Sequence, residues 1–312
     1  MHVERPVTIL LTAVAPRKRE GSSPTGIVGR HLAAQLLDRG IPVRVLAEPE
    51  QLDGWPGAAE VICGSITRPE EAASAFRGVS RVFLAGAAAQ TVGTIVEEAV
   101  DAGIERIVVL SSHGPEFEAH YPPETWFWLA IEKAVENSGI AWAHIRPSAV
   151  MGAPLEGTYP ATGSDWPETI RNERCVREAY LDNGYYPFIH EADLAGVAVA
   201  ALLRSDLTGR VLEAVGLPLS TRSRIAAIEN ALGQRIKQEH RSPDASRAAW
   251  LAQGWPASAV DVTLYGLEVY GSQLLEQTEW TLRQSPSLEE LLGRKPSSFE
   301  QWAQDHAQSF LG

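Results

Sequence analysis

The stretch SSHGPEFEAHY, residues 111–121, holds the densest group of side chains in the chain that could do acid–base chemistry. It begins in RIVVLSS (106–112), a β-branched and aliphatic run that predicts a buried strand. Ser112, His113 and Tyr121 offer two hydroxyls and an imidazole, and an imidazole titrates near neutral pH. We therefore predict these three residues as candidates for proton transfer. The alternative for His113 is a plain hydrogen bond to a neighbouring backbone group.

Lys133 is a further catalytic candidate, in a helix predicted over 124–139. A partly desolvated lysine can act as a general base or orient a carbonyl group. The alternative is a solvated lysine on a helix face. No pair of possible ligands in the 111–121 stretch has a recognised metal-binding spacing with a third ligand elsewhere, so we predict no metal site.

The N-terminal stretch ILLTAVAPRKREGSSPTGIVG (9–29) contains part of a phosphate-binding loop. Glycines such as Gly26 and Gly29 let a backbone approach a diphosphate, whose charge is stabilised at a helix N-terminus. The polar segment VAPRKREGSSP (14–24) separates the apolar strand from these glycines. It either loops over an intact site or disrupts it. Its Arg17-Lys18-Arg19 cluster could supply phosphate contacts from a new direction, or be a solvated charge run.

Strands and helices alternate through the first half of the chain. The predicted strands are 7–13, 42–47, 60–64, 81–86, 106–112 and 141–147, and the predicted helices between them are 26–40, 69–78, 91–103 and 124–139. The strands lack clean polar alternation, which indicates burial on both faces. This order predicts an α/β fold, a doubly wound parallel sheet, over 1–150. Residues 151–312 are predicted to form a smaller, mostly helical substrate lobe, with 187–216 returning to the main sheet.

Composition and charge exclude several classes of partner. Lys and Arg number 27 against 39 Asp and Glu, a formal charge of −12 that disfavours nucleic-acid binding. The N-terminal apolar run is too short to cross a membrane and lacks the basic start of a signal peptide. Two cysteines imply no disulfide framework. We expect a cytoplasmic monomer or homodimer, with no membrane or nucleic-acid partner.

Five stretches in the same order resemble the NmrA-like family of atypical short-chain dehydrogenases. They are TGIVGRHLAAQLLDRGIPVRVL, GIERIVVLSS, EKAVENSGIAWAHIRPS, PFIHEADLAGVAVAALL and GLPLSTRSRIAAIENALGQRI. The resemblance covers nearly the whole chain and implies a Rossmann-like NAD(P)-binding fold. Members of the family include nicotinamide-dependent reductases and regulators that bind the cofactor without turning it over, so the fold alone does not choose a function.

The resemblance also implies which residues would contact a nucleotide if one binds. They are Thr12, Gly26, Ile27, Gly29, Glu48, Ser65, Ala85, Gly86, Ser111 and Lys133. Three positions depart from the family pattern. Ala13 occupies the position of the family's first glycine, and Glu48 occupies or is next to the position of the arginine that NADP-binding members usually carry. A carboxylate there would repel a 2′-phosphate, although it could accept hydrogen bonds from the ribose of NAD. Ser65 follows Gly64 where the family often has an aspartate.

Short-chain dehydrogenases commonly have a catalytic tyrosine four residues before the lysine, but here Leu129 lies four residues before Lys133. Many members of the resembled family also lack this tyrosine, so its absence does not exclude reduction. Aromatic and apolar residues are concentrated in segments that the family uses around its substrate. We predict that five of them line an apolar pocket, with a core role as the alternative for each: Phe117, Trp126, Met151, Trp166 and Tyr186.

Three functions remain open. The altered loop and Glu48 favour cofactor-independent cyclisation, isomerisation or elimination of a bulky apolar small molecule, with no cofactor. The first alternative is an NAD(P)H-dependent oxidoreductase, which the resemblance favours. The second is a non-catalytic regulator that senses a nucleotide.

Overall fold

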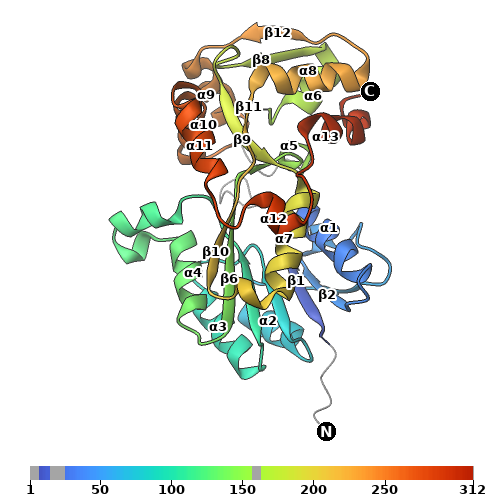
Figure 1. The fold of residues 1–312 in the computed structure, drawn as a ribbon, viewed down its shortest axis with the longest axis vertical. Helices are drawn as coiled ribbons and strands as arrows, with labels where there is room; N and C mark the ends of the chain where they lie inside the picture. The colour runs from blue at the N-terminus through green and yellow to red at the C-terminus, as the bar shows by residue number, and fades with distance from the viewer. Residues whose placement is uncertain (1–6, 15–24, 157–162, 312) are drawn as a thin grey trace. The chain divides into compact units, whose positions relative to one another are not determined.

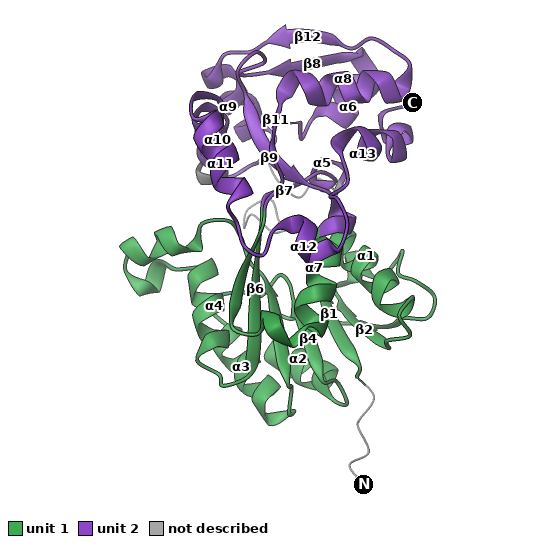
Figure 2. Cartoon of the chain, viewed as in Figure 1, with its two compact units in different colours: residues 1–15, 25–147, 194–214 green, residues 16–24, 148–193, 215–312 purple. Residues whose placement is uncertain are grey.

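The computed structural model describes residues 7–14, 25–156 and 163–311. Two compact units divide the chain (Figure 2). Unit 1 contains residues 1–15, 25–147 and 194–214, and unit 2 contains 16–24, 148–193 and 215–312. No helix among the described residues is both long enough and apolar enough to cross a membrane.

A seven-stranded parallel sheet forms the centre of unit 1 (Figure 1). Its strands are β1 (Ile9–Ala13), β2 (Val43–Ala47), β3 (Glu60–Cys63), β4 (Arg81–Leu84), β5 (Arg106–Leu110), β6 (Ala141–Pro147) and β10 (Arg210–Ala214). They lie in the order β10-β6-β5-β4-β1-β2-β3. Every residue of β1 and β5 is buried, as expected for strands covered on both faces. The structure confirms the predicted doubly wound α/β fold.

Helices follow the strands as the sequence predicts. They are α1 (Thr25–Leu37), α2 (Pro69–Phe76), α3 (Val92–Asp101), α4 (Trp128–Glu136) and α7 (Glu191–Leu203). Helices α2, α3 and α4 share one hydrophobic core with the sheet, which includes Phe76, Ile95 and Val135. Burial of an apolar side chain of this size stabilises the fold by about 1.5–3 kcal/mol. This packing fixes the strand ends on which the polar residues lie.

The carboxylate of Glu118 caps the N-terminus of α4. It accepts hydrogen bonds from the backbone N–H groups of Phe127, Trp128 and Leu129, at 2.8, 3.2 and 2.9 Å. The first N–H groups of a helix have no partner inside the helix, and a negative charge there also opposes the helix dipole. Glu118 therefore fixes where α4 begins.

Replacing Glu118 with Ala should lower the free energy of unfolding by about 1–2 kcal/mol, because three N–H groups lose their acceptor. Denaturant unfolding measures this change. Glu124→Ala is the matched control, since Glu124 is an exposed carboxylate in the same segment. Equal stability of the two variants would contradict the capping role.

Unit 2 holds two small sheets and most of the remaining helices. Strands β7 (Ala149–Val150), β9 (Tyr185–Ile189) and β11 (Pro218–Ser220) form one sheet, and β8 (Cys175–Glu178) pairs with β12 (Lys237–His240). Its helices are α5 (Ala153–Glu156), α6 (Trp166–Glu173), α8 (Thr221–Leu232), α9 (Pro243–Ala252), α10 (Ala257–Ser272), α11 (Leu274–Leu282), α12 (Leu288–Leu292) and α13 (Phe299–Asp305). This helical content agrees with the predicted lobe.

The return of the chain to the main sheet begins later than predicted. Of the segment 187–216, only 194–214 belongs to unit 1, and β10 supplies the seventh strand. Strand β9 pairs instead with β7 and β11 in unit 2. The long segment 25–147 of unit 1 ends at Pro147, three residues before the predicted boundary at 150.

Candidate functional site

The carboxyl ends of the parallel strands bring the polar candidates of unit 1 to one edge of the sheet. Ligands of doubly wound sheets bind at this edge. Thr12, Glu48 and Ala85 lie at or just beyond the ends of β1, β2 and β4, and Ser111 and Arg146 lie at the ends of β5 and β6. The β1–β4 side carries the predicted nucleotide contacts, and the β5–β10 side carries the acid–base residues.

Thr12 is part of the framework on the nucleotide side. Its hydroxyl donates to the carbonyl oxygen of Ala85 at 2.7 Å and accepts from the Ala85 N–H at 2.8 Å. Both bonds are buried, so Thr12 joins the end of β1 to the end of β4. Next to this junction, Gly86 has a φ of +77°, and Val14 fills the space where a Cβ would stand. This pair of strand ends is therefore closely packed.

Glu48 and Ser65 face each other beyond β2 and β3. The Ser65 hydroxyl donates to Glu48 Oε1 at 2.5 Å, and the Ser65 N–H donates to Glu71 Oε2 at 2.6 Å. Glu48 is only 5% exposed and Ser65 is buried. The two residues predicted separately as nucleotide contacts thus form one buried, acidic group.

At the start of α1, Gly26 and Gly29 have no side chains, and neighbouring side chains lie in the space that this leaves. The amide end of Gln51, from the 3₁₀ helix Pro49–Gln51, lies against Gly26, and Trp55 lies against Gly29. Arg30 holds Gln51 Oε1 through its Nη2 at 3.3 Å. The first turn of α1 carries no acidic residue, so its N-terminus suits an anion.

These features fit a dinucleotide at this edge. The space above Gly26 is one that a Cβ would fill, and the far ends of two flexible side chains, Gln51 and Arg30, lie in it. A carboxylate stands at the end of β2, where a ribose is recognised. Ile27 lies in the first turn of α1 and is half-buried. The inserted segment with Arg17-Lys18-Arg19 lies outside the described residues.

Arg146 is the centre of the acid–base side. Its guanidinium donates to both carboxylate oxygens of Glu132, from Nε at 3.0 Å and from Nη2 at 2.7 Å. Glu132 is 1% exposed and also accepts a 2.7 Å bond from the Ser111 hydroxyl. Arg146 Nη1 donates to Glu116 at 2.6 Å and lies 3.7 Å from Glu213. Burial lowers the pKa of Arg146, but the bonds to Glu132 and the nearby carboxylates outweigh it and raise that pKa overall.

His113 lies at the exposed end of this network. Its Nδ1 is 3.3 Å from Glu213 Oε2, and its side chain is 38% exposed. Glu213 comes from β10 and is the register partner of Arg146 on β6. A carboxylate that orients an imidazole is a recurrent arrangement for proton transfer. The described residues therefore place an oriented, solvent-accessible acid–base group at the carboxyl edge.

The other catalytic candidates lie apart from this network. Lys133 pairs with Glu136 at 2.6 Å and is 49% exposed, whereas its neighbour Glu132 points inward. Consecutive residues of a helix project about 100° apart, so both cannot face the same side. Tyr121 is exposed, and Ser112 is half-buried beside His113.

Sequence reasoning missed the three residues that organise the acid–base side: Glu132, Arg146 and Glu213. A signal existed for Glu132, which is an acidic residue in the otherwise apolar run WLAIE at the start of α4. A buried charge is normally paired, so such a position predicts an internal cation partner. The partner itself could not be read without the strand register.

The predicted pocket residues are divided between the units. In unit 1, Phe117 is exposed and Trp126 is half-buried, with its indole N–H donating to the Tyr121 carbonyl at 2.9 Å. In unit 2, Met151 and Trp166 are buried in a hydrophobic core. Tyr186 is half-buried and its ring packs 5.5 Å from that of Tyr270 in the same unit.

Comparison with known proteins agrees with this fold. The profile of a family described as NAD(P)H-binding matches residues 24–179, half of the chain. The chain is 30% identical over 290 residues to a (4-alkanoyl-5-oxo-2,5-dihydrofuran-3-yl)methyl phosphate reductase of Streptomyces griseus subsp. griseus, covering 92% of this chain and 96% of the relative.

Two solved structures share the fold at low identity. A nucleoside-diphosphate-sugar epimerase of Staphylococcus aureus has a TM-score of 0.66 at 20% identity, with 96% of this chain and 100% of that chain covered. The triphenylmethane reductase of Citrobacter sp., complexed with NADP(H), has a TM-score of 0.62 at 17% identity, with 95% and 99% covered. The chain belongs to the NAD(P)H-binding family.

Proposed function

We propose that this chain is an NAD(P)H-dependent reductase of a carbon–carbon double bond conjugated to a carbonyl group. The observation that carries the proposal is the 30% identity to a reductase over nearly its whole length. That relative's name describes an unsaturated lactone with a second carbonyl on the ring and a phosphate on a side arm. A related small, electron-poor lactone is the substrate class that we propose here. The relatives thus favour the reductase alternative over cofactor-independent chemistry.

Reduction of such a bond requires a hydride at one carbon and a proton at the other, and a bound reduced nicotinamide supplies the hydride. His113 is our proposed proton donor, because it is accessible and lies against Glu213. The Glu213 carboxylate orients the imidazole. Arg146 holds Glu213 and Glu116 in place from β6 and acts as a positioning residue.

On the other side of the edge, Gly26 and the N-terminus of α1 would hold the diphosphate, after the end of Gln51 moves aside. Glu48 would accept hydrogen bonds from the adenosine ribose, with Ser65 keeping its carboxylate in position. This assignment uses groups that are already in place at the strand ends.

Purified protein titrated with NADH and NADPH, followed by nicotinamide fluorescence, tests the first half of the proposal. We expect saturable binding of at least one of them. The second half is tested with a phosphorylated unsaturated lactone, by loss of reduced-nicotinamide absorbance together with mass analysis of a product heavier by two hydrogens. Failure to bind either nucleotide would contradict the reductase. Binding without turnover on any conjugated lactone would support the regulator instead.

Glu48 should determine which nucleotide binds better. We expect NADH to bind more tightly than NADPH, because a 2′-phosphate would lie beside a buried carboxylate. Glu48→Gln should shift the ratio of the two dissociation constants toward NADPH by about tenfold, equivalent to about 1.4 kcal/mol. The control is Glu50→Gln, an exposed carboxylate two residues away, which should leave the ratio unchanged. An unaltered ratio in Glu48→Gln would remove Glu48 from nucleotide recognition.

A further inference from the structure

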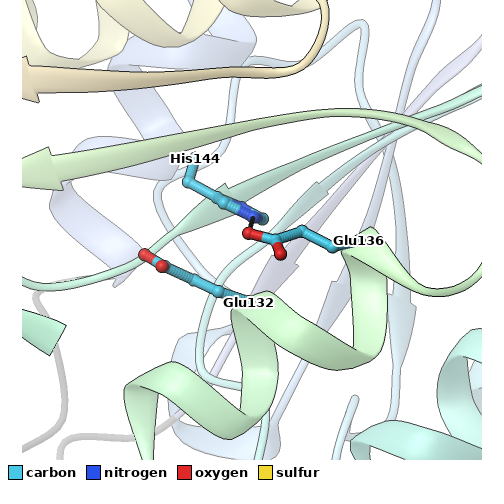
Figure 3. A group of neighbouring side chains, drawn as sticks. All are labelled: Glu132, Glu136 and His144. Atoms are coloured by element: carbon cyan, nitrogen blue, oxygen red, sulfur yellow. Dashed lines mark ion pairs between the residues drawn. The ribbon is translucent and has the colours of Figure 1, made fainter. Parts of the chain in front are cut away.

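Three potential metal ligands meet between α4 and β6, on the inner side of the candidate site. Glu132 and Glu136 lie one helical turn apart on α4, and His144 lies on β6 facing them (Figure 3). One ligand atom of each residue lies within 4.8 Å of the others. Among the described residues, this is the one group of three side chains close enough together to bind a metal ion. The proposed reduction does not use His144 or Glu136.

The imidazole of His144 is an independent observation that points to a ligand at this group. Its side chain is 0% exposed, and neither ring nitrogen has a hydrogen-bond partner. The ring stacks on Trp142 at 4.4 Å and points toward Glu136, whose Oε1 is 3.4 Å from Nε2 (Figure 3). That separation is longer than an ordinary N–H···O bond. A buried polar group without a partner costs about 1–3 kcal/mol, so a buried imidazole in this state requires an explanation.

The distance between Nε2 and Oε1 suits two ligands of one tetrahedral ion. Zinc bonds of about 2.0–2.1 Å place neighbouring ligand atoms roughly 3.3–3.4 Å apart. The imidazole of His144 is buried, and its neutral form is the one that binds metals. Lys133 holds the other oxygen of Glu136, and Arg146 and Ser111 hold Glu132. Such bonds to ligating carboxylates are typical of the shell around a metal site.

We propose that His144, Glu136 and Glu132 bind one zinc-class divalent cation, with water completing its coordination. Mixed imidazole and carboxylate ligands favour Zn²⁺ over Mg²⁺ or Ca²⁺, which prefer oxygen alone. The ion would connect α4 to β6 beneath Arg146 and Ser111, and so stiffen the acid–base side of the site. The sequence predicts no metal because the three ligands have no known motif spacing. This proposal does not depend on the reductase activity.

Isothermal titration of the untagged, chelator-treated full-length protein with Zn²⁺ alone tests the proposal. We expect one ion per chain at micromolar affinity or tighter. In a separate thermal melt, added Zn²⁺ should raise the midpoint of unfolding. His144→Leu and Glu136→Gln should each weaken binding by at least about tenfold, as expected for loss of a ligand. The matched control is His120→Ala, an exposed histidine that should leave the affinity unchanged.

Absence of Zn²⁺ binding by the wild-type protein would overturn the proposal. So would unchanged affinity and stoichiometry in Glu136→Gln, a substitution at a partly exposed position that decides the matter if His144→Leu fails to fold. Cobalt substitution gives a second readout, since the visible bands of tetrahedral Co²⁺ should appear in wild-type protein and vanish in Glu136→Gln.

Discussion

Replacing Arg146 with Met should lower the free energy of unfolding by about 3–5 kcal/mol, because the variant leaves a buried charge without its partner. Glu132 is 1% exposed, and Arg146 supplies two of its three hydrogen bonds. The side chain of Arg146 is itself only 11% exposed, so water cannot replace the guanidinium without local opening. Chemical denaturation at neutral pH measures the change.

The double variant Arg146→Met, Glu132→Leu should recover most of this loss, because apolar residues can replace a buried ion pair at little cost. The control is Arg204→Met, which breaks an exposed pair with Asp206 and should cost less than about 1 kcal/mol. A loss in Arg146→Met no larger than in Arg204→Met would contradict the central role of the buried pair.

The fold could be predicted because its signals are local. β1 and β5 are continuous apolar runs, and each is followed by a helix of clear period, so the parallel sheet follows from short stretches of sequence. The sequence does not show which sheet β9 joins, because YYPFI suits any half-buried strand. The choice between the two sheets is made by pairing with β7 and β11, which are distant in sequence.

The site was predictable only where a residue directly follows a strand. Ser111 and His113 follow β5, and the rule that ligands bind beyond the carboxyl ends of parallel strands places both residues at this edge. Their partners Glu213 and Glu132 are 100 and 21 residues away, and only strand register and helix rotation bring them together. Lys133 illustrates the same limit, because a family position does not reveal whether Lys133 or Glu132 faces the sheet.

The nucleotide side shows a different limit. Glu48 and Ser65 each depart from the family pattern, and considered separately they suggest a degraded site. In the structure they form a hydrogen-bonded pair, so the two departures are linked. Substitutions that look like losses one at a time can therefore be a coupled change of recognition.

The largest kinetic effect is expected from His113→Ala. Loss of a positioned general acid typically costs about 10²–10⁴ in rate. We expect kcat for lactone reduction to fall by at least about 100-fold, with nucleotide affinity unchanged, because His113 lies on the β5–β10 side, away from Glu48. Steady-state kinetics with a parallel nucleotide titration separate the two effects. His120→Ala, an exposed histidine in the same loop, is the matched control.

Glu213→Gln distinguishes a proton donor from a merely structural histidine. The amide keeps a hydrogen bond to His113 but removes the carboxylate charge beside the ring, so kcat for lactone reduction should fall while nucleotide affinity is unchanged. With a structural histidine, kcat should be the same in Glu213→Gln and in the unsubstituted protein. Lys133→Ala should lower the rate less than His113→Ala, because its amine is held by Glu136 on an exposed helix face. A larger loss of rate in Lys133→Ala than in His113→Ala would identify Lys133 as the proton donor.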